Sequence, residues 1–385
     1  MESTLKRTWA EIDLDALAYN YRALRQRVGE NVKFLGVVKA DAYGHGAVQV
    51  SRTLQSLGAD YLAVSSIDEA AELRHGGITM PILILGHTPR EQVGRLIDLH
   101  ITQAVTCQAK ALEYSEEAVR LGGTLTVHIK VDTGMSRLGY LVSGEHFDTG
   151  TADICRACAL PGLYAEGIFT HFAVADEPDE DSAAYTRQQL DLFRRVIGTV
   201  EQRRGRRFAI RHCANSGAVL SWRDKGAALD LVRPGLLTYG VYPDSKRGGL
   251  SLTPVMALKS RVSAITHHKK GDSISYGRTW TAERDCTLAV LPVGYADGLQ
   301  RCLSGKLEVL LRGKRVKQVG RICMDMCMLD VTDIPDAAVG DVVTVFGCGD
   351  DGAPTVAELA ALAGTIPYEL LCGVSLRVPR IYTEN

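Results

Sequence analysis

Residues 34–46, FLGVVKADAYGHG, begin the pattern that decides the fold. The apolar run over residues 34–38 predicts a buried strand, Lys39 stands where that strand ends, and Tyr43 and two glycines follow in a turn. A helical pattern then begins at Ala47. A lysine at the end of a buried strand is a candidate nucleophile toward a carbonyl cofactor, because a dry site lowers the pKa of its amine. The same lysine could simply cap the strand and reach water, and this stretch by itself leaves both interpretations open.

The strand-then-helix pattern repeats from residue 34 to about residue 235. Eight short runs rich in Val, Ile and Leu predict strands over residues 34–38, 61–64, 82–85, 101–105, 125–131, 165–169, 208–211 and 229–232. Helical stretches lie between them, for example at residues 48–57, 68–74, 91–99, 110–121 and 183–202. Eight parallel strands covered by helices predict a closed (β/α)8 barrel. An open doubly wound sheet usually carries G-x-G-x-x-G after its first strand, which residues 39–46 do not match.

A second domain is predicted after the barrel. Residues 246–249, KRGG, are typical of a linker. Strand-like runs follow at residues 256–266, 286–293, 307–311, 316–322, 326–331 and 342–346, with one helical stretch at residues 355–363. We therefore expect an α/β barrel domain over residues 1–245 and a mostly β domain over residues 246–385, with the first ~10 residues packing on the second domain.

Composition excludes several classes of protein. The chain has 385 residues and a formal net charge of -1, so no strongly basic face for nucleic acid is expected. It has no run of about 18 apolar residues, which argues against a membrane span, and residues 1–12 lack the apolar core of a signal peptide. We therefore expect a cytoplasmic protein whose ten cysteines are reduced. Cys155 and Cys158 fall in a helical stretch, and Cys323 and Cys327 have no second pair, so neither redox chemistry nor a metal site is expected.

Candidate chemistry collects at the carboxyl ends of the predicted barrel strands, where the active sites of such barrels lie. The charged and small residues that end or follow these strands are Lys39, Lys130, Arg137, His171, Ser216, Arg233 and Gly235. Ser216-Gly217 and Gly235-Leu236 follow the seventh and eighth strands, and their small side chains and amides suit a phosphate cradle. A lysine with a phosphate site at a barrel mouth suits pyridoxal phosphate, which binds covalently to a lysine amine.

Nine segments resemble bacterial alanine racemases and occur in that family's order. They are residues 38–46 (VKADAYGHG), 130–139 (KVDTGMSRLG), 170–173 (THFA), 215–216 (NS), 232–235 (VRPG), 275–277 (SYG), 294–298 (GYADG), 320–325 (GRICMD) and 377–380 (RVPR). The resemblance spans nearly the whole chain. It implies a pyridoxal-phosphate enzyme of fold type III, a TIM-type (β/α)8 barrel followed by a mostly β C-terminal domain. It also implies interconversion of L- and D-alanine, which supplies D-alanine for peptidoglycan.

The resemblance assigns catalysis to two bases on opposite faces of the substrate Cα. Lys39 would hold the cofactor and act on one face, and Tyr276 would act on the other. In the family this tyrosine comes from the partner subunit, so a homodimer with shared active sites is implied. Inverting a stereocentre by removing and returning a proton is simplest with an acid–base group on each side.

Further roles for charged residues follow from the same resemblance. Arg233 would donate a hydrogen bond to the pyridine nitrogen, since arginine stays protonated in proteins. His171 would lie in a hydrogen-bond chain between Tyr276 and Arg233. Arg137 would meet the substrate carboxylate or the cofactor's phenolic oxygen, and the backbone amide of Met324 would also reach the carboxylate.

The resemblance also assigns the phosphate site and one modified residue. The phosphate would be held by hydroxyls and amides of Tyr43, Ser216, Gly235 and Leu236. Lys130 beside Arg137 would be a second positive charge in a poorly solvated place. Many family members carry a carbamylated lysine at this position, so N6-carboxylysine is predicted for Lys130.

Two remaining features concern the entrance and the substrate. Tyr295 and Asp325 of the partner would line the entrance to the site. Leu376 stands where many members are expected to place a tyrosine whose hydroxyl reaches the phosphate. Loss of that bond would cost on the order of 1.5–3 kcal/mol, and less if water replaces it. Serine-racemising relatives of vancomycin resistance also lack that tyrosine, although they carry a membrane domain, so a serine/alanine racemase is the alternative.

A decarboxylase and a cofactor-carrying barrel are two more distant alternatives. A decarboxylase of the same fold type would place a catalytic cysteine in the β domain, for which Cys323 and Cys327 are candidates. The surrounding residues 322–325, ICMD, match racemases instead. A non-catalytic barrel that carries pyridoxal phosphate would lack the second domain and Tyr276.

Overall fold

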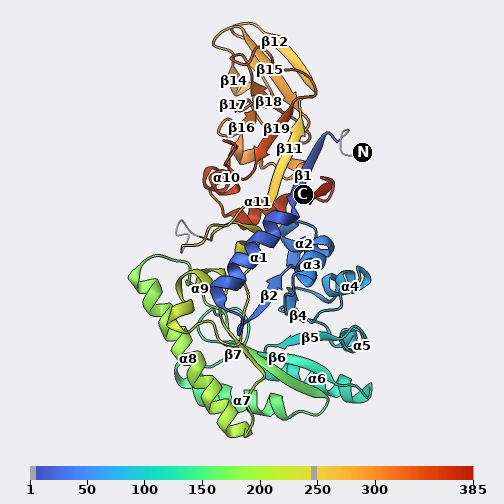
Figure 1. The fold of residues 1–385 in the computed structure, drawn as a ribbon, viewed down its shortest axis with the longest axis vertical. Helices are drawn as coiled ribbons and strands as arrows, with labels where there is room; N and C mark the ends of the chain where they lie inside the picture. The colour runs from blue at the N-terminus through green and yellow to red at the C-terminus, as the bar shows by residue number, and fades with distance from the viewer. Residues whose placement is uncertain (1–5, 244–248, 385) are drawn as a thin grey trace.

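A closed parallel barrel forms the first domain of the computed structural model, which describes residues 6–243 and 249–384 (Figure 1). Its strands are β2 (Lys33–Val37), β3 (Tyr61–Val64), β4 (Ile82–Ile84), β5 (Ile101–Val105), β6 (Leu125–Asp132), β8 (Leu163–Phe169), β9 (Ile210–His212) and β10 (Leu231–Val232). The order β5-β4-β3-β2-β10-β9-β8-β6 is closed by pairing between β5 and β6. A short strand, β7 (Tyr140–Leu141), pairs with β6. The predicted (β/α)8 barrel is confirmed.

Helices cover the outside of this barrel. They are α1 (Leu14–Val28), α3 (Ala47–Ser56), α4 (Ile67–His75), α5 (Val93–Asp98), α6 (Gln108–Arg120), α7 (Phe147–Ala159), α8 (Glu180–Arg204) and α9 (Ser216–Ser221). Local sequence sets their ends: the Ser66 hydroxyl and the Glu69 carboxylate form a capping box at the start of α4, and Gly205 ends α8 at φ 61°. Strands β3, β4 and β5 are buried along their whole length, as expected for parallel strands with both faces covered.

The C-terminal domain is built on a nine-stranded sheet in the order β12-β15-β18-β17-β16-β19-β11-β1-β20. These strands are β1 (Thr8–Asp13), β11 (Met256–Arg261), β12 (Ala264–His268), β15 (Cys286–Leu291), β16 (Glu308–Leu311), β17 (Lys314–Val319), β18 (Cys327–Asp330), β19 (Val342–Phe346) and β20 (Arg380–Thr383). The small hairpin of β13 (Ser273–Ile274) and β14 (Trp280–Thr281) stands beside it. Strand β1, blue in Figure 1, lies between β11 and β20, antiparallel to the first and parallel to the second.

Two details of this domain differ from the sequence prediction. The run predicted as one strand over residues 256–266 is two strands, because Val262 bonds to Asp341 and Ser263 to Val290, so the chain changes partners there. Helix α10 (Val356–Ala363) was predicted, whereas α11 (Pro367–Gly373) was not. The predicted linker at residues 246–249 falls mostly, and the boundary between residues 245 and 246 falls wholly, outside the described residues.

Helix α11 brings the second domain back to the mouth of the barrel. It packs against α2 (Lys39–Gly44), the short helical turn that follows β2. The Arg380 guanidinium fastens the same contact, since its Nε donates to the Gly44 carbonyl at 2.9 Å. The turn that carries Lys39 is therefore held by both domains.

Within residues 6–243 and 249–384, no single helix is long and apolar enough to cross a bilayer. Helices α10 and α11 pass that test only as a pair bent by 103°. The same ranges contain no group of three His, Cys, Asp or Glu side chains arranged to hold a metal ion.

Candidate active site

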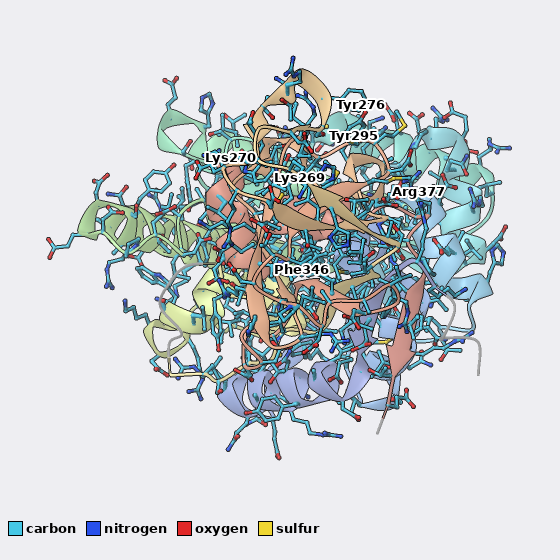
Figure 2. All side chains as sticks on the ribbon, turned by 90° about the horizontal axis from the view of Figure 1, so that it is seen from above. Lys269, Lys270, Tyr276, Tyr295, Phe346 and Arg377 are labelled. Atoms are coloured by element: carbon cyan, nitrogen blue, oxygen red, sulfur yellow. The ribbon has the colours of Figure 1, made fainter. Side chains whose placement is uncertain are left out.

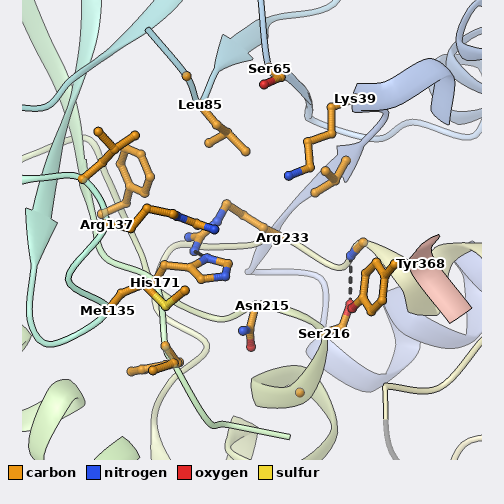
Figure 3. A pocket seen from close by; sticks show the side chains of 18 of the residues that line it. Lys39, Ser65, Leu85, Met135, Arg137, His171, Asn215, Ser216, Arg233 and Tyr368 are labelled. Atoms are coloured by element: carbon orange, nitrogen blue, oxygen red, sulfur yellow. Dashed lines mark hydrogen bonds between the residues drawn. The ribbon is translucent and has the colours of Figure 1, made fainter. Parts of the chain in front are cut away.

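A cavity of about 570 Å³ opens at the carboxyl ends of the barrel strands (Figure 3). Residues predicted for the site that line it are Lys39, Tyr43, Lys130, Arg137, His171, Ser216, Arg233 and Gly235. The side chains of Lys39 and Arg137 point from opposite sides into the same space, above Arg233 and His171. The fold therefore brings together residues that are up to about 200 positions apart in the sequence, at the end of the barrel where chemistry is expected.

Lys39 is carried by a left-handed turn. Residues Ala40, Asp41, Ala42 and Tyr43 all have φ of 53–54°, the conformation of a left-handed helix. This handedness costs non-glycine residues roughly 1–2 kcal/mol each. Side chains compensate: Asp41 Oδ1 accepts the amide of Ala47 at 2.7 Å, and the buried ring of His45 donates from Nδ1 to the Ala42 carbonyl at 2.8 Å. The sequence predicted a turn here but not its handedness.

The surroundings of Lys39 favour its neutral amine. The residue is half-buried. Burial first, and then the nearby charge of Arg137, lower the pKa of the Lys39 amine from its ordinary value. An amine that loses its proton more readily is a better nucleophile toward a carbonyl group and a better base.

Arg233 and His171 form the floor of the cavity. The Arg233 side chain is buried, and burial lowers its pKa to about 10, so it remains a cation at neutral pH. Its Nη2 donates to the Thr170 carbonyl at 2.8 Å and lies 3.4 Å from His171 Nδ1. Burial, followed by the charges of Arg233 and Lys130, holds the pKa of His171 well below its ordinary value. His171 is therefore neutral, accepts at Nδ1 from the guanidinium, and carries its proton on Nε2.

Lys130 lies deeper than Lys39. Its amine donates to the Val131 carbonyl at 3.1 Å and lies 5.2 Å from the centre of the Phe169 ring. Burial, and then the charge of Arg233, lower the pKa of the Lys130 amine to about 7. Near neutral pH a large fraction of this amine is therefore unprotonated.

The opposite wall provides a polar cradle. The Gly235 amide donates to Ser216 Oγ at 2.9 Å, the bond drawn in Figure 3. A Cβ on Gly235 would lie 2.7 Å from the Tyr43 hydroxyl, so only glycine lets these groups converge. Leu236 follows with its own side chain fully buried. An amine on one side, a hydroxyl and amide cradle on the other, and a cation below fit pyridoxal phosphate.

Three other predicted residues line a different cavity. Tyr276, Met324 and Asp325 border a space of about 860 Å³ within the C-terminal domain. Tyr276 is 71% exposed, and the turn before it is fastened by Ser275 Oγ, which donates to the Arg321 carbonyl at 2.8 Å. Figure 2 shows Tyr276 on this domain, as well as Tyr295, which is also exposed. A single chain therefore does not place Tyr276 beside Lys39.

Comparison with known proteins decides the family. Residues 12–243 match the family model "Alanine racemase, N-terminal domain", and residues 255–382 match "Alanine racemase, C-terminal domain". The chain belongs to the alanine racemase family. The alanine racemase of Desulforamulus reducens is 45% identical over 377 residues, which are 97% of this chain and 98% of that protein.

Solved structures of alanine racemases agree in fold. The alanine racemase of Clostridium difficile 630 has a TM-score of 0.91 at 40% identity, covering 99% of this chain and 96% of that one. The Bacillus anthracis alanine racemase with bound L-Ala-P has a TM-score of 0.89 at 35% identity, with 99% and 96% covered. These matches extend through both domains.

The alanine racemase family match leaves the distant alternatives without support. A carrier barrel would lack the second domain that the family models match here. Of the two cysteines that a decarboxylase could use, Cys327 is fully buried, and burial raises the pKa of its thiol to about 12. Cys323 lies within residues 322–325, ICMD, which match racemases.

Leu376 does not lie where the sequence analysis expected. Its side chain is 85% exposed, and it does not line the barrel cavity. The aromatic residue that the C-terminal domain brings to this cavity is Tyr368 of α11, whose ring centre lies 5.8 Å from that of Tyr43. The C-terminal domain therefore places a tyrosine at the barrel cavity from position 368 and not from position 376.

Sequence reasoning missed Tyr368 because α11 was not predicted. The available signal was Ile366-Pro367-Tyr368, since proline favours the first turn of a helix. Other lining residues that were not predicted are Ser65, Leu85, Met135 and Asp176. Ser65, Leu85 and Met135 are small or apolar and Asp176 is a single carboxylate, so none of them carries a chemical signal until the fold places it.

Proposed function

We propose that the protein interconverts L- and D-alanine with pyridoxal phosphate as its cofactor. The observation that carries this proposal is the convergence of the Lys39 amine, Arg233 and the Ser216–Gly235 cradle in one cavity. Relatives named alanine racemase match it along nearly their whole length. The bound cofactor would draw electrons from the substrate and so make its Cα–H acidic.

Lys39 and Tyr276 are the proposed acid–base pair. Lys39 would hold the cofactor and take or return the proton on one face of the substrate Cα, for which its lowered pKa suits it. Tyr276 stands exposed in a separate cavity of its own chain, so it would act on the opposite face of a neighbouring subunit's site. We therefore propose a homodimer with two shared sites, in which the partner's Tyr295 and Asp325 line each entrance.

Arg233 and His171 would set the electronic environment. Arg233 is a donor at every nitrogen, so it would leave the pyridine nitrogen unprotonated and limit the electrons that the ring withdraws. His171 presents its Nε2–H, which would donate to the phenolic oxygen of the partner subunit's Tyr276 and favour its ionised form.

The substrate carboxylate would bind to Arg137 and to the Met324 amide of the partner. Asp132 shapes the Arg137 loop, because its Oδ1 accepts the amides of Gly134 at 2.9 Å and Ser136 at 3.0 Å. A carboxylated Lys130 would supply an anion that orients Arg137. Tyr43, Ser216, Gly235 and Leu236 would hold the phosphate, with Tyr368 beside them.

Alanine is favoured over serine as the main substrate. Leu376, the residue that pointed to serine, lies outside the cavity. We place the reaction in the cytoplasm, where D-alanine for peptidoglycan would be made. All ten cysteines are free in the structure, which suits a reducing compartment.

The test is racemisation of L-alanine, with L-serine, L-lysine and L-ornithine as comparison substrates. The purified protein should show the visible absorption of lysine-bound cofactor and racemise alanine fastest, releasing no carbon dioxide. A Lys39→Ala variant should lose both properties. Lys33→Ala, an exposed lysine at the other end of the same strand, should keep them. Protein that stays colourless with added cofactor would refute the proposal.

A further inference from the structure

A row of hydrogen-bonded side chains runs through the barrel interior beneath Arg233. Arg233 Nη1 lies 2.8 Å from His212 Nδ1, His212 Nε2 lies 2.9 Å from His128 Nδ1, and His128 Nε2 lies 3.1 Å from Glu166 Oε2. We call Arg233, His212, His128 and Glu166 the barrel row. Both histidines are fully buried. Glu166 lies near the amino ends of the strands, since Tyr61, the first residue of β3, donates to it at 2.8 Å.

The packing around the barrel row is built to hold it. The Phe169 ring stacks on His212 at 4.8 Å between centres and 9° between planes. A Cβ on Gly167 would lie 2.7 Å from three atoms of the His128 ring, so the absence of a side chain there makes room for that imidazole. Both rings are therefore closely confined by their neighbours, which favours one order of donors and acceptors.

Chemistry at the two ends fixes the direction of every bond. A guanidinium can only donate, so His212 Nδ1 must accept and its proton must lie on Nε2. That proton is donated to His128 Nδ1, so the His128 proton also lies on Nε2 and is donated to Glu166. Any other protonation of these neutral rings would set two donors or two acceptors against each other.

The charges agree with this assignment. Burial, followed by the charge of Arg233, holds the pKa of His212 well below its ordinary value, so that ring is neutral. Burial alone would raise the pKa of Glu166, but hydrogen bonds from His128 and Tyr61 outweigh it and lower the pKa. The row therefore joins a carboxylate at the base of the barrel to a guanidinium at its mouth through two imidazoles.

We infer that Glu166, acting through His128 and His212, is a positioning residue that fixes the orientation and donor strength of Arg233. A carboxylate that accepts from a histidine makes the other ring nitrogen a stronger acceptor, as it does behind metal-bound histidines. Here the final acceptor, His212 Nδ1, holds Arg233 Nη1, while Nη2 is held by Thr170. The inference rests on the proposed function, in which Arg233 faces the pyridine nitrogen.

A fall in kcat with no change in KM would distinguish this positioning role from a role in binding the substrate. Glu166 does not line the cavity, so it touches neither substrate nor cofactor. In Glu166→Gln the amide still accepts from His128, but the charge is gone and His212 becomes a weaker acceptor. We expect kcat to fall by about tenfold, the lower end of what losing such an outer partner costs at metal sites, with KM unchanged. The absorption maximum of bound cofactor should shift as well.

The matched control is Asp230→Asn. Asp230 is a half-buried carboxylate just before β10 that pairs with Arg211 at 2.6 Å and has no bond to the barrel row. Both substitutions change a carboxylate to an amide and remove a charged contact. Asp230→Asn should lower the melting temperature while leaving kcat and the cofactor spectrum unchanged. Equal kcat and spectra in Glu166→Gln and the unsubstituted protein would overturn the inference.

A second measurement does not depend on activity or on the folding of a variant. In protein labelled with nitrogen-15 at histidine, NMR should show both His128 and His212 as neutral rings protonated at Nε2. A proton on Nδ1 of either ring, or a charged imidazole, would overturn the inference even if the enzyme racemises alanine. Failure of the unsubstituted protein to racemise would instead refute the proposed function and leave the tautomer result standing.

Discussion

At the scale of single residues, the site depends on lysine amines whose pKa is lowered by their surroundings. Lys39 and Lys130 lie in one cavity with two arginines, Arg137 and Arg233, close by. Burial and like charge lower the pKa of both lysines, and that of Lys130 reaches about 7. A buried amine that is partly unprotonated is a nucleophile, and reaction with carbon dioxide would convert it into an anion among cations, with release of a proton.

We expect Lys130 to carry this carboxyl group. In bicarbonate buffer, intact protein measured by native mass spectrometry should be heavier by one carbon dioxide and should lose it on acidification. Lys130→Arg cannot form the carbamate and should show only the unmodified mass. A bare amine at this position in a density map would contradict the prediction.

The state of Lys130 also sets a pH dependence of stability. A bare amine with its pKa lowered to about 7 binds fewer protons when folded than when unfolded between that pH and its ordinary pKa near 10.5. Burying the protonated amine lowers the free energy of unfolding. This destabilisation is complete below about pH 7 and decreases as the pH rises toward 10.5. A side chain that does not titrate removes this slope, so without bicarbonate the free energy of unfolding, measured from pH 7 to 9, should rise less steeply in Lys130→Met than in the unsubstituted protein.

Tyr368 is a proposed hydrogen-bond donor to the cofactor phosphate that the sequence did not predict. Burial raises the pKa of its hydroxyl to about 12, so it is a neutral donor at working pH. Tyr368→Phe should weaken cofactor binding by about tenfold, the loss of one hydrogen bond to a charged group. Fluorescence titration of the apoenzyme measures this. Tyr164→Phe, an exposed tyrosine on the barrel surface, should bind cofactor normally.

At the scale of elements, the turn α2 concentrates backbone strain beneath Lys39. Four consecutive residues adopt a left-handed conformation that glycine would occupy freely, and none of them is glycine. Bonds from Asp41 and His45, together with the packing of α11, hold the turn in place.

Replacing Ala40 by glycine tests this strain. Ala40 is exposed, so the change removes the steric cost of its Cβ without leaving a cavity. The relief of backbone strain should offset the larger unfolded-state entropy of glycine. The free energy of unfolding should therefore stay within about 0.5 kcal/mol of that of the unsubstituted protein. Ala184→Gly, at an exposed position of the right-handed helix α8, should cost about 1 kcal/mol. Equal losses in urea denaturation would mean that the turn is not strained.

The sequence predicted strands better than it predicted turns. Strands such as β3 and β5 are buried on both faces, so their apolar runs end where the strands end. The left-handed turn depends on side-chain bonds from residues as distant as Glu69, whose carboxylate accepts the Ala40 amide at 2.7 Å. The barrel row depends on contacts between strands that no local pattern encodes.

At the scale of the whole molecule, the two cavities are halves of one proposed site. The barrel cavity holds Lys39 and the C-terminal cavity holds Tyr276. In a two-fold dimer each site would take the lysine of one subunit and the tyrosine of the other, an arrangement that two inactive variants can reveal.

Mixing Lys39→Ala with Tyr276→Phe after dissociation should restore activity. Random pairing makes half of the dimers mixed, and each mixed dimer has one intact site, so about one quarter of the unsubstituted activity should return. Each variant by itself should stay inactive, and mixing without dissociation is the control. If subunit exchange is verified and activity still does not return, both bases come from one chain.

The position of β1 has a consequence for biosynthesis. Thr8 pairs with Ser260, and Ala10 with Arg380, so a segment that leaves the ribosome early waits for strands made hundreds of residues later. The intervening barrel can close while synthesis continues, but the sheet above it cannot be completed until residue 383 has emerged. The nascent polypeptide must therefore keep β1, with its Trp9 and Ile12 side chains, unpaired until β11 has been made, a period when chaperones would find it exposed.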